Sequence, residues 1–174
     1  MKNIIYIAIA LIIVLSTQAC INERKKDEGA RPTVDNKTFL KDGIDATLTE
    51  IKASGLAITN SSNLRVIGLA KLMIDDHTGA DSILRKMEAD QFPGERDTIS
   101  IEHQKVIVDL EKQSGAAFDK AYVQLMINDH QATVQLFNNA TNSEDKAISG
   151  FATQTLPVIK MHLDSALSVA AALK

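Results

Sequence analysis

Apolar residues recur at spacings of three and four over most of the chain, which is the period of one face of an α-helix. The pattern predicts a short helix at about 101–112 and four long ones, at about 35–59, 63–89, 116–140 and from the Thr141–Glu144 stretch nearly to Leu173. In the first long helix, the inward stripe is expected to contain Leu40, Ile44, Leu48, Ile51, Gly55 and Ile58. The chain is therefore predicted to be all-α.

Polar residues, glycine and proline mark the ends of these segments. Ser62 and Ser100 are placed to cap the second and third segments. Gly115 follows the short segment as a C-terminal glycine does, and Thr141–Glu144 has the spacing of a capping box. Pro157 lies inside the last segment, where its missing N–H is expected to bend the helix.

The connections between the segments predict a four-helix bundle. Short connections after the first and third long helices make each of these pairs antiparallel. The longer connection between the second and third long helices contains the short helix and permits a crossover, which gives the up-down-down-up topology of ferritin-like bundles. The alternative is a plain up-and-down bundle of five helices.

The first residues are typical of an export signal. Lys2 is followed by an unbroken apolar run of 12 residues, Ile4–Leu15, and then by small and polar residues up to Cys20. Such a run is shorter than the roughly 20 residues that span a bilayer as a helix. We therefore expect residues 1–19 to be a lipoprotein signal peptide and Cys20, the only cysteine, to be lipidated. Because Thr17 occupies the position of the usual lipobox leucine, an ordinary secretory signal is the alternative.

Residues 20–34 are polar and lack an apolar period, so they are expected to form a flexible tether between the lipid anchor and a bundle domain at 35–174. The predicted location is the bacterial cell envelope, at the outer membrane and facing the periplasm or the cell surface. The net charge is −3, with Arg24–Lys26 the only basic cluster. This charge argues against nucleic-acid binding and leaves the membrane and an envelope protein as the expected partners.

One six-residue segment occurs twice. Leu72–His77 reads LMIDDH, and Leu125–His130 repeats it as LMINDH. Each histidine lies 14 residues after the first residue of its predicted helix, or about 21 Å along the helix axis. If the two helices run parallel, His77 and His130 reach the same layer of the bundle.

A transition-metal ion held at this layer is one functional hypothesis. Each histidine follows a methionine by one helical turn, and two imidazoles with two thioethers suit a soft ion such as Cu(I). Two imidazoles with carboxylates suit Zn, Fe or Mn instead. The candidate ligands are His77, His130, Met73, Met126, Asp76 and Asp129.

The other two histidines are expected elsewhere. His162 lies 18 residues after Glu144, or about 27 Å along its helix, whereas His130 lies about 15 Å from the same end. We therefore expect a second polar layer, a hydrogen-bonded brace formed by His162, Tyr122, Asp119 and Glu50. His103, on the short helix, is expected to cap the outside of the bundle.

No catalytic residues are predicted. The sequence contains no Glu-x-x-His pair of the kind that di-iron bundles use, and no nucleophile elbow or phosphate-binding glycine loop. Two hypotheses follow: a non-enzymatic, membrane-tethered bundle that binds an envelope partner, or a periplasmic metal-binding protein that uses its core histidines. In the first, the buried histidines are satisfied by hydrogen bonds and fix the register of the helices.

Several separated segments resemble one bacterial envelope family, known as domain of unknown function 4142. They are Asp75–Thr78, Glu102–Gln104, Ser114–Val123 and Thr155–Pro157 followed by His162. The resemblance extends from about Phe39 to Leu173. It implies a ferritin-like bundle in an exported protein, and it implies no particular chemistry.

Overall fold

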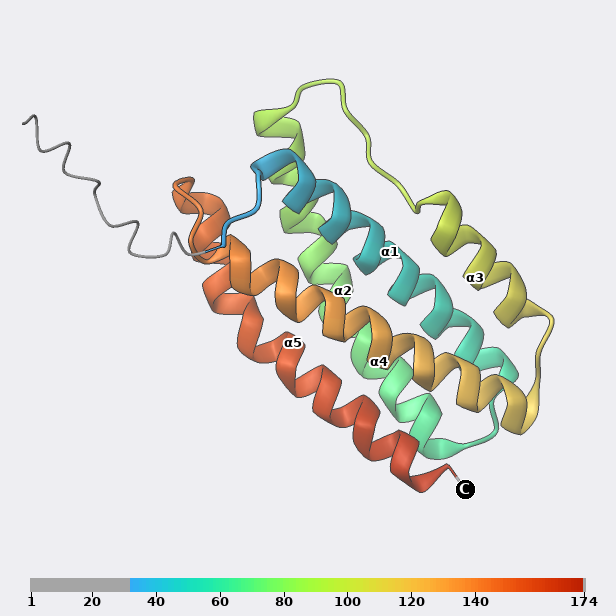
Figure 1. Ribbon diagram of the computed structural model, residues 1–174. Coiled ribbons are helices and arrows are strands. Elements are labelled where there is room, and N and C mark those ends of the chain that lie inside the picture. Colours follow the sequence, from blue (N-terminus) through green and yellow to red (C-terminus); the bar gives the residue numbers. More distant parts are fainter. Residues whose placement is uncertain (1–31, 174) are drawn as a thin grey trace, which may run out of the picture. The chain divides into compact units, whose positions relative to one another are not determined.

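A computed structural model of the protein describes residues 32–173, and these residues form five helices without a strand. The helices are α1 (Asn36–Asn60), α2 (Leu64–Gln91), α3 (Ile101–Glu111), α4 (Gly115–Ala140) and α5 (Lys146–Ala172) (Figure 1). The prediction of an all-α chain with four long helices and one short helix is confirmed. The predicted signal peptide at 1–19, the lipidation site Cys20 and most of the tether at 20–34 lie outside the described residues.

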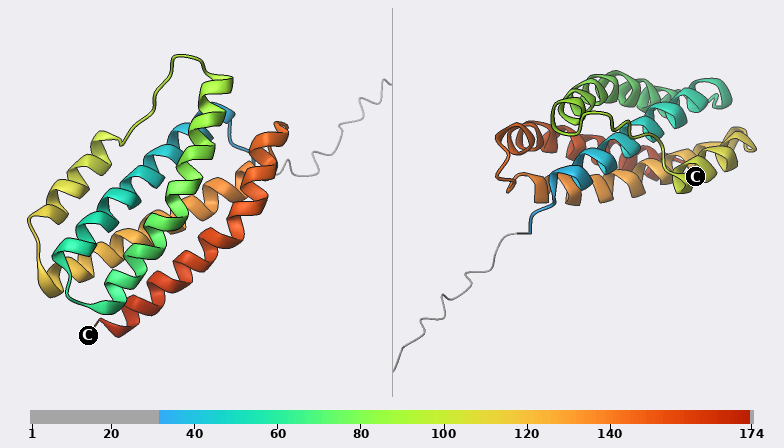
Figure 2. Two further views of the ribbon diagram at one scale, coloured as in Figure 1. Left: turned by 180° about the vertical axis from the view of Figure 1, so that it is seen from behind. Right: turned by 90° about the horizontal axis from the view of Figure 1, so that it is seen from above.

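The four long helices lie side by side, and α3 lies along the outside of α1 and α4 (Figures 1 and 2). Residues 61–63 join α1 to the antiparallel α2, and residues 141–145 join α4 to the antiparallel α5. The longer segment 92–100 leads from α2 back to α3. No helix within residues 32–173 is both long enough and apolar enough to cross a bilayer.

The helices begin with capping residues of the expected kind, but two of the caps are at other positions than predicted. Ser100 caps α3, as predicted, by accepting a hydrogen bond from a backbone N–H of its first turn. Asn63 caps α2 in place of Ser62, because the extended backbone at Asn63 directs its side-chain oxygen toward the first turn. The capping box expected at Thr141–Glu144 is replaced by Asp145, whose carboxylate accepts two backbone N–H groups.

Two apolar clusters fill the interior, one toward each end of the bundle. The first comes from the end of α1, the starts of α2 and α4 and the end of α5, and it includes Ala57, Leu69, Phe118 and Ala166. The second comes from the start of α1, the ends of α2 and α4 and the start of α5, and it includes Phe39, Leu84, Phe137 and Ile148. Each large buried side chain stabilises the fold by about 1.5–3 kcal/mol. Between the two clusters lies a layer of ionisable side chains.

Candidate metal centre

Three imidazoles meet in this layer, each from a different long helix. His77 comes from α2, His130 from α4 and His162 from α5, and their exposed fractions are 7%, 0% and 1%. The ring centroids lie 5.2–5.5 Å apart, and one ring nitrogen from each histidine lies within 4.8 Å of the other two. Nitrogens bound to one tetrahedral zinc ion lie roughly 3.3 Å apart. To bind one ion, the nitrogens would have to approach one another by up to about 1.5 Å.

The fourth long helix, α1, places a buried carboxylate beside the rings. Glu50 is 1% exposed, with Oε2 2.9 Å from Nε2 of His77 and Oε1 3.1 Å from Nδ1 of His130. Even at these distances, Glu50 Oε1 and His77 Nε2 make no well-directed hydrogen bond to any described residue. The carboxylate therefore lies next to ring nitrogens of two of the three histidines.

In two of the rings, one nitrogen is held by a hydrogen bond to a protein oxygen. Nδ1 of His130 is 2.9 Å from the carbonyl oxygen of Met126, which can only accept, so Nδ1 donates. Nε2 of His162 is 2.8 Å from Oδ2 of Asp76 and donates to it in the same way. Histidines that bind metal ions usually donate their second ring N–H to a carbonyl or carboxylate, which fixes the tautomer.

These hydrogen bonds leave one nitrogen on each of the two rings available. Nε2 of His130 and Nδ1 of His162 are buried, and neither has a hydrogen-bond partner within residues 32–173. A buried polar atom without a partner costs about 1–3 kcal/mol. An ion bound between the rings would remove that cost.

The electrostatics of the layer favour a negative carboxylate and at least one neutral imidazole. Burial raises the pKa of Glu50, but the nearby His77 and His130 lower it by more, so the net shift is downward. Burial lowers the pKa of His130, and the Glu50 carboxylate outweighs it, so that pKa is raised. Burial also lowers the pKa of His162, and Asp76 offsets this only in part. His162 is therefore neutral and able to bind an ion at neutral pH.

The sequence-based prediction that His77 and His130 share a layer agrees with this geometry, whereas the prediction for His162 is wrong. The counting assumed that α4 ends and α5 begins at one level. The turn at 141–145 instead lets α5 begin beyond the end of α4 (Figure 1), which shifts His162 into the layer of the other two histidines.

The second polar layer does not form as predicted. The hydroxyl of Tyr122 lies 2.9 Å from Oγ of Ser54. Asp119 is buried at the end of the bundle where α2 and α4 begin, beside Asn63 and Leu173. Glu50 and His162 both join the layer of His77 and His130, whereas Tyr122 and Asp119 lie elsewhere, so the expected group of four is divided.

The remaining candidate ligands have other surroundings. Met73 and Met126 are fully buried in the first apolar cluster, where methionine commonly serves as core packing. Asp76 contacts His162 from the solvent side. Asp129 faces His103 instead of the three histidines.

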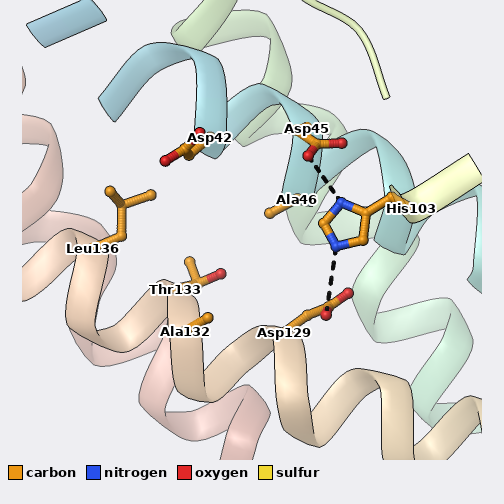
Figure 3. Close-up of a pocket in the computed structure, with 8 residues that line it drawn as sticks. All are labelled: Asp42, Asp45, Ala46, His103, Asp129, Ala132, Thr133 and Leu136. Carbon is orange, nitrogen blue, oxygen red and sulfur yellow. Dashed lines mark hydrogen bonds and ion pairs between the residues drawn. The ribbon is translucent and has the colours of Figure 1, made fainter. Parts of the chain in front are cut away.

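His103 joins α3 to both α1 and α4 at the outside of the bundle (Figure 3). Its Nδ1 lies 2.9 Å from Oδ2 of Asp45, and its Nε2 lies 3.8 Å from Oδ1 of Asp129. These residues line a cavity of about 240 Å³ together with Asp42, Ala46, Ala132, Thr133 and Leu136. Burial and the Glu50 carboxylate raise the pKa of Asp129 to about 7. The sequence analysis placed His103 outside the bundle but did not identify Asp45 as its partner.

Comparison with known families agrees with the resemblance in the sequence. The family described as "Domain of unknown function (DUF4142)" matches residues 22–169, which include α1 to α4 and most of α5. No curated protein and no solved structure matches the chain.

Proposed function

We propose that this chain, which belongs to the family described as Domain of unknown function (DUF4142), binds one transition-metal ion in the core of its helical bundle. The observation that carries the proposal is the cluster of His77, His130 and His162, with a ring nitrogen of each within 4.8 Å of the others. Glu50 is the proposed fourth ligand, because its carboxylate lies beside two of the three rings.

The unpaired atoms of the layer favour an ion over a hydrogen-bonded brace. Four buried atoms of this layer make no well-directed hydrogen bond to any described residue: Glu50 Oε1, His77 Nε2, His130 Nε2 and His162 Nδ1. In a structural brace, buried polar groups are normally paired with one another or with water. A cation bound between the rings would pair the buried nitrogens of His130 and His162 that have no hydrogen-bond partner among the described residues.

The donor set indicates the class of ion. Imidazole nitrogens bind Zn, Cu, Fe and Ni, and a carboxylate adds preference for a divalent ion over soft Cu(I). Three nitrogens and one oxygen also match the tetrahedral geometry of zinc. We therefore propose a divalent ion of the zinc or iron(II) class.

The bundle is further proposed to have the ferritin-like up-down-down-up topology, which the shared starting end of α2 and α4 supports. The protein is proposed to be an exported lipoprotein of the cell envelope, with the apolar run at Ile4–Leu15 and Cys20 as the support. In that setting, the bundle would bind its ion on the far side of the inner membrane.

Elemental analysis of the purified full chain tests the metal proposal. After exposure to micromolar Zn, Fe, Cu and Mn and removal of loose ions, we expect about one equivalent of metal per chain, since the cluster accommodates a single ion. The His77→Ala/His130→Ala variant, shown to be helical by circular dichroism, is expected to carry none. A wild-type chain without bound metal would contradict the proposal and favour a bundle that only binds an envelope partner.

A Cys20→Ser substitution tests the lipid anchor. Without the thiol no lipid can be attached, so the chain is expected to move from the membrane fraction to the soluble fraction of cells that export it. Fractionation and immunoblotting measure the change, and a Ser16→Ala variant serves as the control that keeps the cysteine. Continued membrane association of Cys20→Ser would show that the anchor is not at this residue.

A further inference from the structure

The proposed metal site is closed along the axis of the bundle. Its four candidate ligands lie between the two apolar clusters, which fill the interior toward both ends. Glu50 and His162 are each 1% exposed, and His130 is fully buried. An ion must therefore enter and leave through one side of the bundle.

The side between α2 and α5 offers a direct connection to solvent. The side chain of Asp76 is 41% exposed, yet its carboxylate lies 2.8 Å from Nε2 of His162, whose side chain is 1% exposed. The adjacent His77, also on α2, is the most exposed of the three histidines. One hydrogen bond thus links a surface carboxylate to a buried ligand.

The opposite side of the bundle, between α1 and α4, offers a less direct connection between the three histidines and solvent. Asp129 is the carboxylate nearest the layer there, but its side chain is only 11% exposed and faces His103. His103 in turn is held by Asp45 of α1. The cavity on this side is lined by Asp45, His103 and Asp129, and none of the three histidines of the cluster lines it.

We infer that the ion enters and leaves between α2 and α5, and that Asp76 is the residue that controls this passage. The carboxylate provides the first oxygen ligand for an arriving cation. Once the ion lies between the rings, the same carboxylate accepts the Nε2–H of His162 and keeps Nδ1 directed at the ion. Asp76 is thus a positioning residue with a second role in loading. This inference rests on the proposed function.

Two substitutions separate these roles. Asp76→Asn removes the negative charge but keeps an oxygen that can accept the Nε2–H of His162. Asp76→Ala removes both. The matched control is Asp75→Asn, which neutralises the neighbouring exposed carboxylate on α2, and Asp129→Asn tests the side between α1 and α4.

The experiment measures loading and release of Co²⁺ by the purified full chain. Stopped-flow absorbance at the d–d bands gives the association rate, and competition with a chelator gives the dissociation rate and the affinity. For both Asp76 variants we expect the association rate to fall by about tenfold, since a charge that attracts the ion is lost. For Asp76→Ala alone we expect the affinity to fall by a further factor of about 10–100, since the hydrogen bond that orients the ligand is lost. Asp75→Asn and Asp129→Asn should resemble the wild type.

The outcomes are distinct. An unchanged association rate in both Asp76 variants would overturn the inference while leaving the metal site in place. A slower rate in Asp129→Asn instead would show that the ion passes between α1 and α4. A wild-type chain that binds no Co²⁺, Zn²⁺ or Fe²⁺ would overturn the proposed function and this inference together. Circular dichroism of each variant verifies the fold, and the partly exposed position of Asp76 makes its substitutions tolerable.

Discussion

Replacement of His162 by alanine is expected to weaken Zn²⁺ binding by about a thousandfold, or about 4 kcal/mol. His162 supplies one of the three ring nitrogens in the cluster, and its Nδ1 is buried and unpaired among the residues that the structure describes. Loss of an outer hydrogen-bond partner of a ligand typically costs 10–100-fold in metal affinity. Loss of the ligand itself is expected to cost more.

The fourth histidine is the matched control for this substitution. His103 contacts Asp45 and Asp129 and lies outside the cluster, so His103→Ala should bind Zn²⁺ as the wild type does. Competition with a chromophoric chelator measures both affinities. Equal weakening by the two substitutions, or no weakening by His162→Ala, would contradict the assignment of His162 as a ligand.

The second large effect is that Zn²⁺ is expected to raise the Tm of the protein by an amount that depends on pH. An ion that binds the folded state at 100 times its Kd stabilises it by about 2.7 kcal/mol. For a domain of this size that corresponds to a rise in Tm of about 5–15 °C. We expect this rise at pH 8 and little of it at pH 5.5, because an imidazole must be neutral, with its coordinating nitrogen unprotonated, to bind a metal ion.

The direction of this pH dependence follows from the pKa of His130. Glu50 raises that pKa above the ordinary value of 6.5, so the metal-free fold gains stability from protonated His130 below pH 6.5 and loses it as the pH rises through the raised pKa. Zn²⁺ must displace this proton, and its affinity therefore increases as the pH rises through the same range. The lowered pKa of His162 means that this residue competes for protons only in more acidic solution.

Differential scanning fluorimetry with and without Zn²⁺, from pH 5.5 to pH 8, measures the effect. The His162→Ala variant should show no shift in Tm at any pH, and it thereby controls for non-specific binding. An equal rise in Tm at both ends of the pH range would contradict the involvement of a protonated histidine.

The sequence was sufficient to predict the number and approximate bounds of the helices, but it was less informative about which face of α1 is buried. Of the six residues of the expected stripe, Leu40 and Ile44 are buried, but Ile58 is 37% exposed. In the second half of α1 the interior is lined by Glu50, Ser54 and Ala57. Hydrophobic periodicity locates a buried face only when that face is apolar. On α1 the polar residues of the candidate site occupy it.

The composition of the candidate site was predicted in part. The repeated segment led to His77 and His130, because equal distances from two helix starts place residues at one depth when the helices begin at the same end. His162 was missed because its depth depends on how far α5 begins beyond α4, which the conformation of a short turn determines. Glu50 was predicted to lie in one layer with His162, and both belong to the layer of His77 and His130, so the error in the depth of His162 separated Glu50 from these two histidines as well.

The distribution of the four candidate ligands over four helices has a consequence for the whole chain. Glu50 and His77 belong to one helical hairpin, and His130 and His162 to the other. A single ion would then be a removable crosslink between two hairpins that are otherwise held together by side-chain packing and by hydrogen bonds such as that between Ser54 and Tyr122. Its departure would let the hairpins separate more readily, so the supply of metal would change the rigidity of the whole bundle.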